Sequence, residues 1–130
     1  MLVHAEKLRV RWVDTDASGR IHYTAAFKYF EVAEWELLRR AGFPLSNSGK
    51  TSGLPRVNVS ATFHLALHVD DEIEVRLWAE HIGRTSIRFC GEIYRSGDKC
   101  VTGSITVVFV DEQEQPQPIV ESIRAALQTA

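Results

Sequence analysis

The stretch "TAAFKYFEVAEWELLRRAG", residues 24–42, decides how the rest of the chain must be arranged. Helix-forming residues are frequent in it and β-branched residues are scarce, so we expect a helix over residues 24–41. Thr24 or Tyr23 is placed to act as the N-cap, and Gly42 follows the last turn as the C′ residue. Apolar side chains cover most of the circumference, as is typical of a helix surrounded by other structure. The helix is therefore predicted to be central to the fold.

The chain after this helix alternates apolar and polar residues in four segments, which is the pattern of strands with one face toward a core. These segments are residues 57–69, 72–82, 85–94 and 100–111. In the first of them, every second residue from Val57 to Val69 is apolar, which predicts an unusually long strand. Short turn signals separate the segments, so neighbouring strands are expected to pair antiparallel.

The two ends of the chain complete the predicted architecture. Residues 7–13, "KLRVRWV", alternate as a strand does, and "PIVESIRAALQ", residues 118–128, is expected to form a short C-terminal helix after Pro118. One apolar helix with a long, curved antiparallel sheet wrapped around it is an α+β fold.

Length, composition and charge limit the classes of protein. The 130 residues, 45% hydrophobic and 25% charged, fit a single domain over residues 1–130. The formal charge of −2 gives no basic footprint, so nucleic acid is not expected as a partner. No apolar run approaches the roughly 20 residues of a membrane span, and the N-terminus does not resemble a signal peptide. We therefore predict a cytoplasmic protein without a membrane partner.

Immediately before the helix, "DTDASGRIHY", residues 14–23, gathers oxygen-bearing side chains. A calcium loop is one interpretation, but the twelfth position of an EF-hand loop needs a bidentate Glu and here holds Ala25. An aspartate-pair phosphatase is a second interpretation, but that fold requires repeated βαβ units. A single catalytic carboxylate held against a helix N-terminus is the third interpretation. It needs only one ionised carboxylate and the start of a helix, and the chain has both within this stretch.

The third interpretation relies on Asp16 and on the backbone around Tyr23. Gly19 permits a tight turn, so the carboxylate and the free amides at the helix N-terminus can face one bound carbonyl group from two sides. A carboxylate either attacks an acyl carbon or withdraws a proton from the water that attacks it, and a thioester needs the least further help. Asp14 is expected to make hydrogen bonds that shape the turn.

These segments together resemble a known family. "VRWVDTDASGRIHYTAAFKYFEVAEWELLRRAG", "SGLPRVNVSATFHLALHVDDEIEV" and "GRTSIRF" are similar to the 4-hydroxybenzoyl-CoA thioesterase and acyl-CoA thioester hydrolase family, and the resemblance covers nearly the whole chain. It implies the hotdog fold and hydrolysis of an acyl-CoA substrate without a metal or redox cofactor. It also implies sites formed between subunits, and hence a homodimer or homotetramer.

The resemblance assigns roles to particular residues. Asp16 corresponds to the catalytic carboxylate, as nucleophile or general base, and the backbone amide of Tyr23 corresponds to the oxyanion contact. Arg84 and Ser86 correspond to positions that meet the phosphates of CoA. Gly53, next to the start of the second strand, is expected to be a backbone neighbour of the substrate.

His22 is the one residue of the cluster whose role stays open. Many bacterial members of the family carry Tyr then His before the helix, whereas this chain has His22 then Tyr23. The imidazole is therefore one step out of register, and both a catalytic and a structural role are retained. A non-catalytic domain that binds acyl thioesters is the alternative to an enzyme, because one fold can serve both functions.

Other conspicuous side chains receive structural interpretations. Trp12, Trp35 and Trp78 are predicted to contribute packing. His64 and His68 would lie about 13 Å apart on one strand, too far to share a metal ion. Two glutamates of the helix are predicted to form salt bridges or face solvent, namely Glu31 and Glu34.

Overall fold

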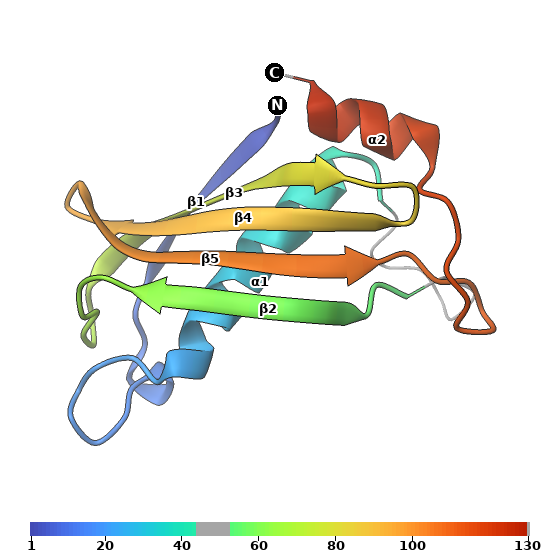
Figure 1. Cartoon of the computed structure of the whole chain (residues 1–130). Coiled ribbons are helices and arrows are strands. Elements are labelled where there is room, and N and C mark those ends of the chain that lie inside the picture. Colours follow the sequence, from blue (N-terminus) through green and yellow to red (C-terminus); the bar gives the residue numbers. More distant parts are fainter. Residues whose placement is uncertain (44–52, 130) are drawn as a thin grey trace.

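The computed structural model describes residues 1–43 and 53–129 (Figure 1). Five strands form one sheet in the order β1-β3-β4-β5-β2, and every neighbouring pair is antiparallel. The long helix α1 lies across one face of this sheet, and the short helix α2 lies near the N-terminus (Figure 1). The elements are β1 (Val3–Arg9), a 3-10 helix (Trp12–Asp14), α1 (Tyr23–Arg40), β2 (Arg56–Phe63), β3 (Glu72–Ile82), β4 (Ser86–Arg95), β5 (Asp98–Val108) and α2 (Glu121–Gln128).

The predicted architecture is confirmed: one long helix packs against a curved antiparallel sheet. The predicted bounds of β3 are correct, and Gly42, with φ of +89°, ends α1 as expected. α1 begins one residue earlier than predicted, because His22 rather than Thr24 or Tyr23 is the N-cap. No helix in the described part of the chain has the length and apolar character needed to cross a membrane.

The first strand ends earlier than its sequence pattern suggests. β1 stops at Arg9, and Val10 then bonds through both its N–H and its C=O to the turn before β3, at Asp71 O (2.9 Å) and Asp70 N (2.8 Å). The chain next enters the 3-10 helix, which carries Trp12 outside the sheet. Trp12 is 85% exposed, so the packing predicted for it does not occur within the single chain.

The predicted strand over residues 57–69 is also too long. β2 ends at Phe63 because the next two amides, of His64 and Leu65, both donate to the single carbonyl of Cys100 (2.7 and 3.2 Å) and so leave the ladder. β2 is an edge strand, and most of its alternating apolar side chains are exposed in the single chain. In β2 these are Val57, Val59 and Phe63; Leu65 and Val69, in the chain after β2, are also at least 44% exposed.

Phe30 of α1 lies directly against two glycines of the sheet. Gly91 of β4 and Gly103 of β5 are cross-strand partners, so together they leave a flat gap two residues wide. A Cβ atom on Gly91 would lie 2.6 Å from the Phe30 ring, and one on Gly103 would lie 2.7 Å from it. The Phe30 ring therefore occupies the space that two side chains would need, and it brings α1 close to the sheet.

Substitution of Gly91 tests this contact. Gly91→Ala is expected to lower the free energy of unfolding by about 1–3 kcal/mol, because the added methyl group overpacks the site beneath Phe30. Urea unfolding followed by circular dichroism measures the change. Gly53→Ala is the control, because its Cβ would meet only ordinary contacts, at 3.6 Å or more. In a Gly91→Ala/Phe30→Leu double variant the two losses should be less than additive; full additivity would show that the contact is not the cause.

Candidate active site

The segment before α1 folds into a small hairpin with Asp16 at its turn. Thr15 and Ile21 form an antiparallel bridge, Asp16 N–H donates to Arg20 O (2.8 Å), and Gly19 N–H donates to Asp16 O (3.0 Å). Gly19 has φ of +81°, which a glycine adopts without strain and which closes the three-residue turn. Residues 14–23 thus form a compact loop, as the sequence predicts.

The Asp16 carboxylate is exposed and held by its neighbour in the turn. Its Oδ1 accepts hydrogen bonds from the hydroxyl of Ser18 (2.5 Å) and from the backbone N–H of Ser18 (2.8 Å). These two bonds hold the pKa of Asp16 below the ordinary value of 3.8. Asp16 is therefore ionised at neutral pH, as a nucleophile or general base requires.

His22 closes the N-terminus of α1 with its own side chain. Its Nδ1 accepts from Thr24 N–H (3.3 Å) and lies 2.8 Å from Thr24 Oγ1, while its ring stacks on that of Tyr23 at 4.7 Å. His22 O accepts from Ala25 N–H (2.8 Å). Tyr23 N–H has no acceptor among the described residues. His22 thus has a structural role as the N-cap, its catalytic role stays a prediction, and the Tyr23 amide is available to a ligand.

A buried hydrogen bond to Asp14 joins the loop to α1. It is 9% exposed, and its Oδ2 accepts a hydrogen bond from the hydroxyl of Tyr29 (3.0 Å). The carbonyl oxygen of Asp14 accepts from His22 N–H (2.8 Å). Burial, together with the bond to Asp14, raises the pKa of Tyr29 well above its usual value of 10.0, so the phenol remains a donor. Asp14 shapes the loop as predicted, through a buried contact that the sequence did not reveal.

A pocket of about 480 Å³ brings together Asp16, His22 and Tyr23. The chain that follows β2 forms its opposite wall, which is largely apolar. Sequence reasoning missed that wall because it assigned these residues to a longer strand. The remaining lining residues are Arg20, Ile21, Phe63, His64, Leu65, Ala66 and Leu67.

The other predicted site residues lie at the far end of the sheet. Gly53 O accepts from Val110 N–H (3.2 Å), and Ser86 pairs with Val108 at the end of β5. Arg84 lies in the turn between β3 and β4, just before Ser86.

These positions are near the start of β2, whereas the pocket with Asp16 is beyond its end. An eight-residue strand spans about 26 Å. Within one chain, Gly53, Arg84 and Ser86 are therefore not neighbours of Asp16.

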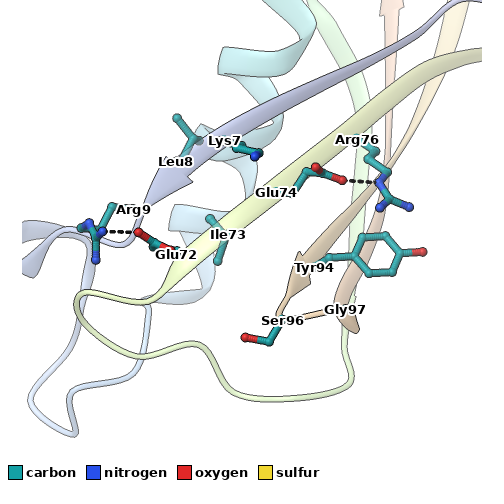
Figure 2. A pocket seen from close by; sticks show the side chains of 10 residues that line it. All are labelled: Lys7, Leu8, Arg9, Glu72, Ile73, Glu74, Arg76, Tyr94, Ser96 and Gly97. Atoms are coloured by element: carbon teal, nitrogen blue, oxygen red, sulfur yellow. Dashed lines mark hydrogen bonds and ion pairs between the residues drawn. The ribbon is translucent and has the colours of Figure 1, made fainter.

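A larger cavity of about 650 Å³ lies beside β1, β3 and the turn between β4 and β5 (Figure 2). Both of its carboxylates are in ion pairs: Arg9 pairs with Glu72, and Arg76 pairs with Glu74 at 2.6 Å (Figure 2). The Arg76 guanidinium also lies 4.1 Å from the centre of the Tyr94 ring. This cavity contains none of the predicted site residues and offers no unpaired carboxylate.

The fold and the pocket with Asp16 together define a protein of the hotdog class. Residues 10–127 match the family model described as the thioesterase-like superfamily, and the chain belongs to that superfamily. Its members include enzymes that hydrolyse thioesters, which agrees with an ionised carboxylate beside a free amide.

Individual proteins are similar over most of the chain. A protein of Aquifex aeolicus (strain VF5), provisionally named an esterase, is 36% identical over 67% of this chain and 69% of its own. A 1,4-dihydroxy-2-naphthoyl-CoA hydrolase of Prochlorococcus marinus (strain NATL1A) is 27% identical over 78% of this chain and 74% of its own. The structure of a gentisyl-coenzyme A thioesterase superposes with a TM-score of 0.87 at 26% identity, over 95% of this chain and 98% of that one.

The buried bond between Tyr29 and Asp14 gives a prediction about stability. Tyr29→Phe is expected to lower the free energy of unfolding by about 1.5–3 kcal/mol, because it leaves a buried carboxylate without its donor. Thermal and urea unfolding at pH 7 measure this loss. Tyr23→Phe is the matched control, since the Tyr23 side chain is 64% exposed and should change stability by less than about 0.5 kcal/mol. Equal stabilities of the two variants would contradict the anchoring role.

Proposed function

We propose that this protein is an acyl-CoA thioesterase, which hydrolyses an acyl-CoA thioester to the free acid and CoA. The observation that carries the proposal is that the ionised Asp16 and the free Tyr23 N–H lie in one pocket with an apolar wall. Two of the similar proteins are named for CoA thioesters, a dihydroxynaphthoyl-CoA and gentisyl-CoA. No metal or redox cofactor has a part in this chemistry.

In this mechanism the thioester carbonyl oxygen accepts a hydrogen bond from Tyr23 N–H. The positive end of the α1 dipole stabilises the negative charge that develops on that oxygen during attack. Asp16 either adds to the carbonyl carbon, or takes a proton from a water molecule that adds to it. The tetrahedral intermediate then expels CoA as the thiolate. On the general-base route this step releases the free acid directly, whereas on the nucleophilic route it leaves a mixed anhydride with Asp16, which water then hydrolyses to the free acid and the restored carboxylate. Both routes begin from the ionised carboxylate, which the lowered pKa of Asp16 favours.

We also propose that the working unit is a dimer in which two β2 strands pair across a two-fold axis. One backbone edge of β2 has no strand partner within the described residues, and its apolar side chains are exposed. Two-fold antiparallel pairing sets the end of each β2 beside the start of the other. Gly53, Arg84 and Ser86 of the partner subunit then approach Asp16, which the single chain does not achieve. Further pairing of dimers into a tetramer stays a prediction.

Substitution of Asp16 tests the enzymatic proposal. Asp16→Asn is expected to reduce kcat/KM by about 10²-fold or more, because an amide neither attacks the thioester nor accepts a proton from water. Thiol release from a panel of short, long and aromatic acyl-CoAs measures the rate. The wild-type rate should persist as the pH falls toward 4, because Asp16 is protonated only below its ordinary pKa of 3.8.

The control for this experiment is Asp70→Asn. Asp70 is an exposed carboxylate with φ of 72°, a conformation that Asn also adopts, and the variant should retain the wild-type rate. Full activity of Asp16→Asn would remove Asp16 from the mechanism. Binding of acyl-CoA by the wild type without hydrolysis of any of the panel would support the non-catalytic binding domain instead.

The dimer is tested at the middle of β2. Val59→Lys is expected to give a monomer with at least about tenfold lower kcat/KM, because a charged side chain opposes burial of the strand and separates the two halves of the site. Sedimentation velocity and thiol release measure the two effects. Val3→Lys, at a position that is 46% exposed on β1, at the opposite edge of the sheet from β2, is the matched control. A wild-type monomer with full activity would refute the shared site.

A further inference from the structure

Residues 82–86 join β3 to β4, and we call them the β3–β4 turn. Each of their five carbonyl groups accepts a hydrogen bond. One side chain bonds two of them: Arg124 of α2 donates from Nη1 to Ile82 O (3.3 Å) and from Nη2 to Gly83 O (2.7 Å). Backbone N–H groups bond the other three, from Ile119 to Arg84 O (2.9 Å), from Phe109 to Thr85 O (2.7 Å) and from Gly83 to Ser86 O (2.8 Å).

The donors of the same turn are free. The backbone N–H groups of Arg84 and Thr85 have no acceptor among the described residues. The Arg84 side chain is exposed and has no hydrogen bond or ion pair within the same part of the chain. Successive N–H groups in a turn form a concavity that binds anions, and a guanidinium is well suited to a phosphate. The β3–β4 turn therefore has the donors that a phosphate group requires.

The two bonds from Arg124 determine where one of these donors points. The carbonyl and the N–H of a trans peptide group lie in one plane and point in opposite directions. Because Gly83 O points toward Arg124, the N–H of Arg84, in the same peptide group, points away from α2. A guanidinium donates from a rigid planar fork, so bonds to two successive carbonyl groups fix the orientation of both peptide groups.

Arg124 is itself part of the packed structure. Its side chain is 21% exposed, and its Nε lies 3.5 Å from Oε2 of Glu121 on the preceding turn of α2. α2 packs against β3 (Figure 1), so the guanidinium bridges the helix and the turn that follows this strand. With two of its nitrogens already bonded to the turn, Arg124 is placed to orient the turn rather than to bind a ligand.

The location of the turn suits a phosphate of CoA. In an acyl-CoA the pantetheine arm separates the thioester from the phosphates, so a phosphate site has to lie away from the reacting carbonyl group. Within one chain the β3–β4 turn lies at the opposite end of β2 from Asp16. In the proposed dimer it approaches the Asp16 pocket of the other protomer.

We propose that Arg124 is a positioning residue for CoA binding: it holds the carbonyl groups of Ile82 and Gly83, and so directs the donors of Arg84 toward a phosphate of the substrate. Arg124 does not contact the substrate. This inference rests on the proposed thioesterase function, and on the proposed dimer for the approach of the turn to Asp16.

Paired substrates test this role. Thioesters of CoA and of pantetheine with the same acyl group share the reacting carbonyl, but only the first carries phosphates. The ratio of their kcat/KM values should be at least about tenfold in the wild type, because hydrogen bonds to a charged phosphate are strong. Arg124→Met should lower this ratio at least about fivefold, through a higher KM for the acyl-CoA. Hydrolysis of the pantetheine thioester should change by less than about threefold, whereas a loss of folded protein lowers both rates equally.

Further variants separate position from charge. Arg124→Lys keeps the positive charge but not the planar fork, so it should also lower the ratio, by at least about threefold. Arg124→Gln is a second neutral variant and should behave as Arg124→Met does. Glu121→Gln removes only the exposed partner of Nε and should keep the wild-type ratio. Arg76→Met, in the cavity that contains none of the predicted site residues, is the matched control for loss of an ion-paired arginine.

A double variant tests whether Arg124 acts through Arg84. Arg84→Met should lower the ratio as well, because it removes the guanidinium that binds the phosphate. In Arg84→Met/Arg124→Met the two losses should be less than additive, since the second residue serves to place the first. Full additivity would show that Arg124 acts independently of Arg84 and would overturn the proposal.

A binding measurement separates this proposal from the proposed function. S-ethyl-CoA is a thioether, which occupies the site but cannot be hydrolysed. Calorimetry should show similar affinities of the wild type and Asp16→Asn for it, and at least about fivefold weaker binding by Arg124→Met.

The possible negative results differ in meaning. Absence of hydrolysis of every acyl thioester contradicts the proposed function, while binding of S-ethyl-CoA still decides the role of Arg124. An unchanged ratio in Arg124→Met, or equal losses with both thioesters, assigns the residue to stability alone and overturns the inference. An unchanged ratio in Arg124→Lys attributes the effect to charge and overturns it as well.

Discussion

Phe30 can approach the sheet only because Gly91 and Gly103, paired across β4 and β5, have no side chains. This contact brings α1 close to the sheet, and the N-terminus of α1 lies beside the chain that follows β2. The adjacent residue, Tyr29, holds Asp14 by a buried hydrogen bond. The packing of one turn of α1 therefore also fixes the loop that presents Asp16.

Local sequence was sufficient to predict the part of the site that is built locally. Asp16 and Tyr23 lie within one hairpin and the first residue of α1, so their proximity follows from a short stretch with a glycine turn. The strand bounds of β3 were predicted for a similar reason, since this strand is paired on both sides and alternates cleanly. The role of His22 could not be decided from the sequence. A histidine at this position can either accept a hydrogen bond from the backbone or face a ligand.

The errors fall where distant contacts decide the structure. The alternation of apolar and polar residues alone predicts that β2 continues to residue 69. In the structure β2 ends at Phe63, because the amides of His64 and Leu65 both donate to Cys100 O and so leave the ladder. Alternation likewise cannot separate a strand face that is buried within the chain from one that is exposed, so it did not predict that Val59 is 50% exposed. Trp12 lies outside the sheet because Val10, two residues before it, is hydrogen-bonded to the turn before β3.

The edge strand β2 connects the remaining features of the molecule. At its end lie an ionised carboxylate and an amide without an acceptor among the described residues. At its start lies the buried carboxyl group of Glu34, one oxygen of which has no hydrogen-bond partner among the same residues. Within one chain, the carboxylate and the amide lie at the opposite end of β2 from Gly53, Arg84 and Ser86. The proposed two-fold pairing of β2 would bring these positions of one protomer toward Asp16 of the other, and it would cover the exposed apolar side chains of β2 in the same step. Assembly and substrate recognition would then depend on the same contact.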